Sequence, residues 1–179
     1  AWEVSLEFHS RRDAVSRTYR YHILNRPWPS PLRRNTHYWV RNELQVSLMA
    51  SAAQGLVGGH DFRWFAVGFP AEKSALRRVY RWEVWQEGDT VIIECEANGF
   101  LRHQIRRANA LLIEIGRGRF PESTLKDALE GTLLHPLDCP QAPAHGLCLI
   151  KVTYRTPLRP AAAAGRSSSP VMSGAGPGL

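Results

Sequence analysis

The chain has 179 residues, a length that corresponds to one domain or two small ones and is sufficient to bury a hydrophobic core. Apolar residues make up 44% and charged residues 22%, which excludes a wholly disordered or fibrous protein. No stretch approaches the roughly 18 uninterrupted apolar residues of a membrane-spanning helix, so we expect no membrane partner. The net charge of +7 favours a polyanionic partner, nucleic acid first.

The cations are mostly arginine. Lys73, Lys126 and Lys151 are the only lysines among the 23 basic residues. Because guanidinium binds phosphate in a bidentate manner and stacks on bases, this bias suits RNA, although a basic protein without such a partner or a GC-rich gene gives the same composition. Cys95 and Cys148 lie in apolar, strand-like runs, and no Cys-x-x-Cys spacing occurs, which predicts free thiols in a reducing cytoplasm.

The N-terminal half predicts strands followed by a helix. Alternating apolar residues predict one strand over residues 2–8 and a second over residues 17–25, the latter with Tyr19, Tyr21 and Ile23 on one face. Three prolines between residues 27 and 31 predict an extended loop. Residues 42–57 predict a helix with Asn42 as its N-cap.

The C-terminal half predicts a hairpin, two helices and a last strand. The strands cover residues 78–86 and 90–97, the helices 101–116 and 121–131, and the last strand 147–154. The longer helix has a buried stripe of Leu101, Ile105, Ala108, Leu112 and Ile115. We therefore expect an α+β domain over residues 1–155, with an antiparallel sheet and helices packed on one of its faces. Residues 156–179 are rich in Pro, Gly, Ala and Ser and are expected to form a disordered tail.

Several common catalytic patterns are missing from the sequence. It has no Gly-rich phosphate loop, no Gly-x-Ser-x-Gly, no His-Glu-x-x-His and no ordered Cys/His metal spacing. The adjacent pair His60 and Asp61 is interpreted as stabilising a turn rather than as a metal site.

Three segments instead combine basic, aromatic and polar residues. Residues 8–21 join arginines to Tyr19 and Tyr21, which suits either a cationic stacking surface or a core-facing Tyr pair beside solvated arginines. Residues 97–107 place Arg102 and Arg106 one turn apart at the predicted helix start, where the helix dipole opposes them and an anionic partner is expected. Residues 142–147, Ala-Pro-Ala-His-Gly-Leu, predict a tight turn before the last strand.

In this order, the segments resemble the C-terminal half of the bacterial tRNA pseudouridine synthase A family. Phe-His-Ser-Arg at residues 8–11 and Arg-Thr-Tyr-Arg-Tyr at 17–21 are similar to its FHAR and RxYxY segments. Residues 59–65 resemble its GxHDFxxF segment, 100–106 its FxxHxVR helix and 142–147 its AxAHGL turn. Four ordered motifs over residues 8–154 form a far more specific signal than any one of them.

The resemblance implies an enzyme that isomerises uridine to pseudouridine in the anticodon arm of tRNA, without a cofactor or metal. A flipped-out uridine would pack on Tyr19, and Arg106 would hold the catalytic Asp ionised. Arg11, Arg17, Arg20, Arg102 and His103 are the expected RNA-binding residues. The resemblance also implies a homodimer for the intact enzyme.

One departure from the family pattern concerns the nucleophile. The family carries its catalytic Asp in an RTDxGVH segment of the N-terminal half, and this segment does not occur among the 179 residues. We therefore expect the chain to be a fragment that is inactive alone, with the Asp on a preceding segment. The alternative is a non-catalytic, basic RNA-binding module that keeps the fold without the nucleophile.

Overall fold

The structure is a computed structural model that describes residue 4, residues 6–133 and residues 140–155. The predicted tail and Asp138 lie outside these residues. The strands are β1 (Ala14–Asn25), β2 (Tyr38–Val40), β3 (Gly58–Asp61), β4 (Leu76–Glu87), β5 (Thr90–Ala97) and β6 (Leu147–Tyr154). The helices are α1 (Val46–Gln54), α2 (Gln104–Gly116) and α3 (Ser123–Glu130), with short 3₁₀ turns η1 (Arg63–Phe65) and η2 (Ala144–Gly146).

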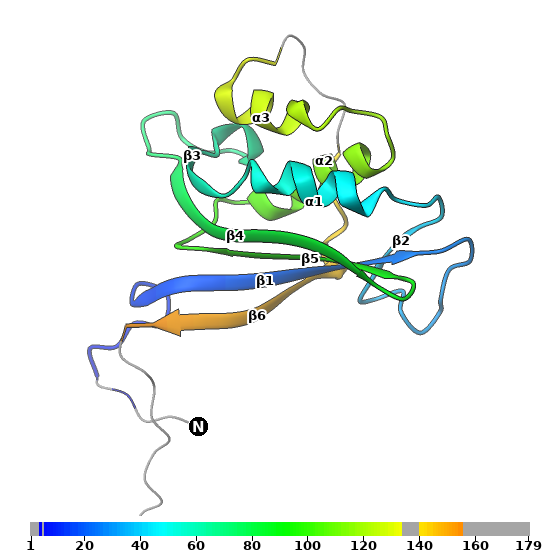
Figure 1. The fold of residues 1–179 in the computed structure, drawn as a ribbon. Helices are drawn as coiled ribbons and strands as arrows, with labels where there is room; N and C mark the ends of the chain where they lie inside the picture. Colours follow the sequence, from blue (N-terminus) through cyan, green and yellow to red (C-terminus); the bar gives the residue numbers. More distant parts are fainter. Residues whose placement is uncertain (1–3, 5, 134–139, 156–179) are drawn as a thin grey trace, which may run out of the picture.

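The strands form one mixed six-stranded sheet in the order β2-β1-β5-β4-β3, in which β6 also pairs with β1 (Figure 1). The hairpin of β4 and β5 is antiparallel, as are the pairs of β1 with β5 and with β6. The prediction of an antiparallel sheet is wrong for one pair of strands, because β1 and β2 pair in parallel over Ile23–Asn25 and Tyr38–Val40. The long loop between them carries the chain back to the same end of β1, which makes this short parallel pair possible.

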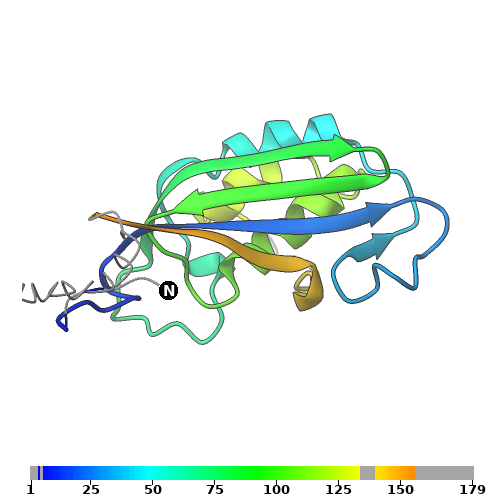
Figure 2. The same cartoon turned by 90° about the horizontal axis from the view of Figure 1, so that it is seen from below.

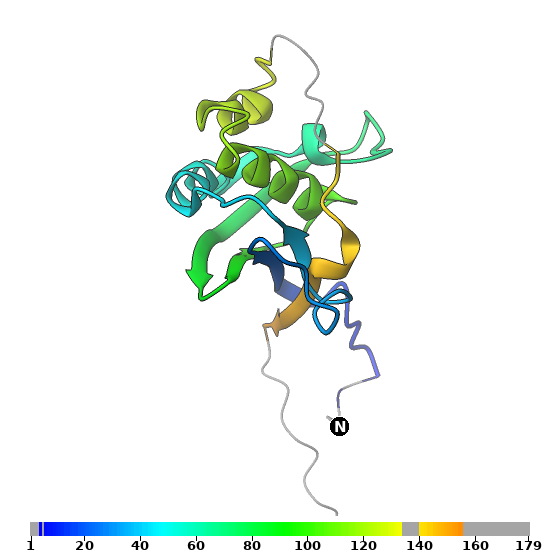
Figure 3. The same ribbon diagram turned by 90° about the vertical axis from the view of Figure 1, so that its right-hand side faces the viewer.

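The described helices lie on one face of the sheet, and the other face is free of them (Figures 1 and 2). Tyr21, Ile23 and Trp82 project from the sheet into the helix layer and are fully buried. The residues of the predicted stripe are all buried, with Leu101 in the loop before α2 and the other four within the helix. The side view shows the same two layers, with the loop between β1 and β2 near the sheet (Figure 3). None of the described helices is long and apolar enough to cross a membrane.

Several predicted boundaries are wrong for local reasons. Leu6–Phe8 do not form a strand: Leu6 and Glu7 lie in a turn, and the sheet begins only at Ala14. Helix α1 begins at Val46 rather than near Asn42, whose backbone carbonyl accepts a hydrogen bond from the Asn25 side chain at 2.7 Å. Strands β2 and β3 are too short, at three and four residues, to produce a clear alternation.

Helix α2 begins at Gln104, three residues later than predicted. His103 adopts a left-handed conformation with φ 65°, which ends the preceding loop and prevents the helix from extending back to Leu101. The Gln104 side chain accepts a hydrogen bond from the Leu101 backbone N–H at 2.8 Å. Arg102 therefore belongs to the loop, and the predicted one-turn spacing between Arg102 and Arg106 on one helix is wrong.

Candidate nucleic-acid interface

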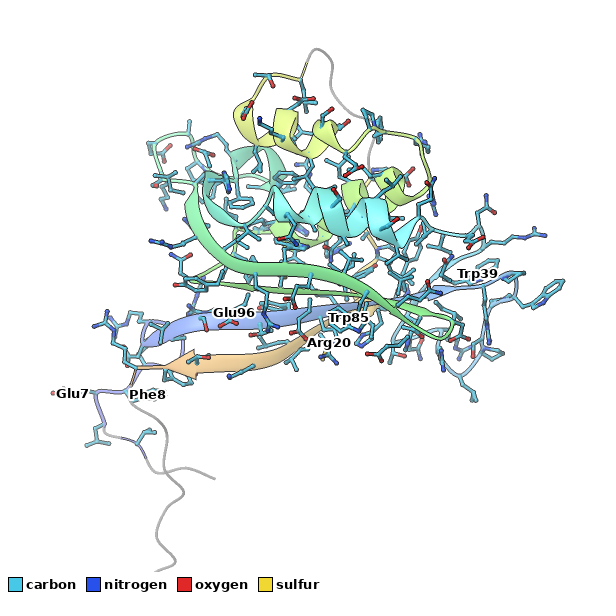
Figure 4. The ribbon with its side chains drawn as sticks, viewed as in Figure 1. Glu7, Phe8, Arg20, Trp39, Trp85 and Glu96 are labelled. Carbon is cyan, nitrogen blue, oxygen red and sulfur yellow. The ribbon has the colours of Figure 1, made fainter. Side chains whose placement is uncertain are left out.

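A cleft of about 690 Å³ lies at the end of the sheet where β1 begins. Figure 4 marks this end of the molecule by Phe8. Five chain segments meet there: the N-terminal turn before β1, β1 itself, the start of β4, the loop between β5 and α2, and strand β6. The lining residues are His9, Ser10, Arg11, Arg12, Arg17, Tyr19, Arg77, Gly99, Phe100, Leu149 and Val152.

The charge of the cleft has one sign. Four arginines line it, and none of its lining residues is an Asp or Glu. Asp13 lies next to the cleft in sequence, but its carboxylate accepts a hydrogen bond from the His9 backbone N–H at 2.7 Å. A concave surface of this composition attracts anions and binds phosphate through the planar guanidinium groups.

The N-terminal turn has a fixed shape. Arg11 and Arg12 donate their backbone N–H groups to Nδ1 of His9 at 3.2 and 3.3 Å, and the Asp13 N–H donates to the His9 carbonyl at 3.0 Å. Phe8 packs on the ring of Tyr154, with centroids 5.0 Å apart. The turn therefore presents the Arg11 and Arg12 side chains from a rigid backbone.

Arg17 holds this turn against the rest of the cleft. Its guanidinium donates to the carbonyls of Ala14 at 2.9 Å and Asn98 at 2.7 Å, and also to the carbonyl of Arg11. These three carbonyls come from the start of β1, the loop after β5 and the N-terminal turn. Arg17, which the sequence predicts as an RNA ligand, thus joins three backbone segments in this structure.

The floor of the cleft is aromatic and apolar. Tyr19 meets the ring of Phe100 edge to face, with centroids 5.5 Å apart and an interplanar angle of 86°. Leu149 and Val152 of β6 complete the floor. The pairing fixes the Tyr19 ring, while Tyr19 itself remains partly exposed to the cleft.

Arg20 lies on the opposite face of the sheet from Tyr19. It forms an ion pair with Glu94 at 2.7 Å. Its guanidinium also stacks over the ring of Trp85 at 5.6 Å, and Figure 4 shows the two side chains together. Glu94, only 7% exposed, also pairs with Arg81 at 2.7 Å. The alternation along β1 separates Arg20 from the cleft, and Arg20 is part of a charge network on the helix-free face.

The other predicted residues also lie outside the cleft lining. Arg102 and His103 stand in the loop before α2, where Nε of Arg102 donates to Nε2 of His103 at 3.3 Å. Arg106 is in the first turn of α2 and donates from Nε to the Ala142 carbonyl at 2.7 Å. Among the described residues, no carboxylate forms an ion pair with Arg106.

Arg106 lies close to Tyr21, two residues along β1 from Tyr19. Burial raises the pKa of the Tyr21 hydroxyl well above its ordinary range, while the nearby Arg106 charge acts in the opposite direction. The Tyr21 hydroxyl donates to the Pro143 carbonyl at 2.8 Å. The predicted pair of Tyr19 and Arg106 thus shares the helix-facing side of β1, but Arg106 does not line the cleft.

Two of the sequence motifs have structural roles here. In the Gly-His-Asp-Phe segment, His60 and Asp61 lie in β3, and the Asp61 carboxylate accepts the Arg63 backbone N–H at 2.8 Å, which is the turn-stabilising contact that the sequence predicts; Phe62 is fully buried. In the Ala-His-Gly-Leu segment, Gly146 packs directly against the Tyr21 ring, and His145 bonds to the His37 carbonyl at 3.0 Å. Among the described residues, no group of three His, Cys, Asp or Glu side chains could hold a metal ion.

Sequence reasoning missed Arg77, Leu149 and Val152. Arg77 is at the start of β4, next to Arg78, and the sequence gives no means to tell which of the two arginines faces the cleft. The register of β4 against β3 and β5 places Arg77 in the cleft lining. Leu149 and Val152 enter the cleft because β6 shifts register against β1 between Thr18 and Tyr19. No local sequence signal indicates that shift.

Cys95 is buried, as predicted for an apolar strand, and burial raises its thiol pKa. Cys148 is exposed, because β6 is an edge strand. The prediction that its thiol packs as a small hydrophobic residue is therefore wrong.

Comparison with known proteins agrees with the geometry. The sequence pattern of the family described as tRNA pseudouridine synthase matches residues 52–155. The tRNA pseudouridine synthase A of Geobacter sp. (strain M21) is 36% identical over 154 residues, which cover 86% of this chain and 62% of that protein. Those of Thermus thermophilus and Roseiflexus castenholzii are 39% and 41% identical, over 86% of this chain in each case and over 61% and 57% of their own lengths.

The chain spans about six-tenths of the length of these relatives. The family pattern covers more than half of the chain and includes β4, the loop between β5 and α2, and β6, which contribute to the cleft. The chain therefore belongs to the tRNA pseudouridine synthase A family.

Proposed function

We propose that the protein isomerises uridine to pseudouridine in the anticodon stem-loop of tRNA, and that the chain supplies the RNA-binding cleft and the Tyr19 and Arg106 side chains. The observation that carries this proposal is the Arg-lined cleft, free of carboxylates, over the Tyr19–Phe100 pair. The relatives' shared name, tRNA pseudouridine synthase A, supports the reaction and the substrate class. A homodimer in the cytoplasm is part of the same proposal.

The chemistry requires the uridine to leave its stack, which costs a few kcal/mol. The cleft offsets this cost in two ways. Arg11, Arg12 and Arg77 bind the phosphates that flank the target, and the Tyr19 ring receives the extruded base, a contact of about 1–3 kcal/mol. Because Phe100 fixes the Tyr19 ring, the ring loses little conformational entropy when the base binds.

The nucleophilic carboxylate is proposed to come from a segment outside this sequence. None of the four described aspartates lines the cleft: Asp61 caps a turn, Asp89 pairs with Arg26 and Arg33, Asp13 bonds to His9, and Asp127 lies on α3. Nε of Arg106 is anchored on the Ala142 carbonyl, so the terminal nitrogens have a fixed direction. We infer that they hold the incoming carboxylate ionised, because a guanidinium next to it lowers the carboxyl pKa.

The test compares Arg106→Lys with Arg107→Lys in the complete gene product, using tritium release from unmodified tRNA. Lysine keeps the charge at position 106 but loses the planar fork, so the rate should fall about 10²–10³-fold. Arg107 stacks on Trp64 at 5.1 Å and donates to the Ala66 carbonyl at 3.1 Å, so Arg107→Lys should reduce thermal stability while the rate stays near normal. Near-normal turnover by Arg106→Lys contradicts the proposed role.

A further inference from the structure

The segment that runs from the end of β1 through β2 to Arg41 has a one-sided charge that the cleft does not explain. Residues 26–41 contain four arginines and two tryptophans but no Asp or Glu. This 26–41 segment lies at the opposite end of the sheet from the cleft. Figure 4 shows Trp39 at one end of the molecule and Phe8 at the other, and β1 connects the two ends (Figure 1).

Internal contacts fix the shape of the 26–41 segment. Arg26 and Arg33 both pair with Asp89 of the β4–β5 turn, at 2.9 and 2.8 Å. The indole of Trp39 donates to the Arg26 carbonyl at 2.9 Å. The Arg33 carbonyl accepts the backbone N–H groups of Thr36 at 3.1 Å and His37 at 2.9 Å. The loop is therefore ordered before any ligand binds, which lowers the entropic cost of binding.

Three side chains of the segment remain available for a partner. Trp28 is 72% exposed, and the side chains of Arg34 and Arg41 form no ion pair with any described carboxylate. Asp89 is thus the one acidic partner that the segment's four arginines have among the described residues. An exposed indole and unneutralised guanidinium groups on one segment match the pattern by which proteins bind unpaired bases and phosphates.

We propose that the 26–41 segment is a second RNA contact, in which Trp28 stacks on an unpaired base while Arg34 and Arg41 bind phosphates. The identity of the RNA as tRNA rests on the proposed function. Seven residues of extended chain lead from Tyr19 in the cleft to Arg26, which separates the two contacts by about 23 Å at roughly 3.3 Å per residue. One folded RNA can bridge this distance, whereas a single nucleotide cannot. The segment therefore adds affinity for the folded RNA without taking part in the chemistry.

The test measures tRNA affinity against salt concentration for the wild-type chain and its variants. Arg34→Gln and Arg41→Gln should each reduce the slope of log affinity against log salt by about 0.7–0.9, because each removes one phosphate contact. Trp28→Ala should weaken binding about 5- to 100-fold and leave the slope unchanged. Two controls should behave as wild type: Leu32→Ala removes a fully exposed apolar neighbour, and Lys126→Gln removes an exposed charge on α3.

The outcomes separate this proposal from the proposed function. If the variants of the 26–41 segment bind as wild type while Arg77→Gln in the cleft weakens binding, the second contact is refuted and the cleft stands. If the wild-type chain does not bind tRNA, both proposals fail. If Trp28→Ala changes the sedimentation coefficient but not the RNA affinity, the segment contacts another protein or a second copy, which also refutes the proposal.

Discussion

Replacing Arg17 by Lys tests whether the hydrogen bonds of its guanidinium shape the cleft, because the substitution keeps the positive charge. Lysine keeps the positive charge, but one ammonium cannot reach the carbonyls of Arg11, Ala14 and Asn98 together. A hydrogen bond to a charged group contributes about 1.5–3 kcal/mol, so the loss of one such contact lowers the cost of opening the N-terminal turn by that amount. At about 1.4 kcal/mol per tenfold change, the turn should open about 10- to 100-fold more often.

Hydrogen exchange of the backbone amides over residues 9–13 measures this opening directly. Arg17→Lys should accelerate their exchange about 10- to 100-fold and weaken tRNA binding, although the net charge is unchanged. Arg12→Lys is the matched control, because the Arg12 side chain is exposed and has no hydrogen bond or ion pair described within the fold. Wild-type exchange in Arg17→Lys would show that Arg17 does not hold the turn, and the explanation of the cleft's shape would be wrong.

Two further changes act on the fold around the cleft. Gly146→Ala places a Cβ 2.8 Å from the buried Tyr21 ring, so thermal unfolding should shift down, with a loss of about 1–3 kcal/mol from overpacking; an unchanged midpoint would contradict this packing. Burial lowers the pKa of both His22 and His37, whose rings lie 5.2 Å apart, so the unfolded chain binds more protons and stability should fall as the pH drops below about 6.5. His37→Gln should reduce this pH dependence in melting curves between pH 7 and 5, and an unaltered slope would exclude His37 as a source.

The long periodic elements could be predicted from the sequence. Strand β1, the β4–β5 hairpin, helix α3 and the buried stripe of α2 all follow from apolar spacing, because burial on one face imposes that spacing. The short strands β2 and β3 could not be predicted, because three or four residues show no clear period and tertiary pairing determines them. The start of α2 was also mispredicted, because no local sequence signal indicates that His103 adopts the left-handed backbone conformation.

The candidate site was predicted in part. The sequence identified Arg11, Arg17 and Tyr19, which the fold brings into one cleft. It did not separate them from Arg20, because that distinction depends on which face of β1 each side chain occupies. Nor could it show that Arg17 binds three carbonyls, since these belong to segments far apart in the chain.

Pseudouridine formation on an unmodified tRNA transcript tests the central claim most directly. The complete gene product should convert uridine in the anticodon stem-loop. The 179-residue chain alone should bind the transcript with a salt-dependent affinity but form no pseudouridine, because its cleft is proposed to lack the catalytic carboxylate. Conversion by the chain alone would place the nucleophile among its own residues, and the absence of conversion by the complete product would contradict the proposed function.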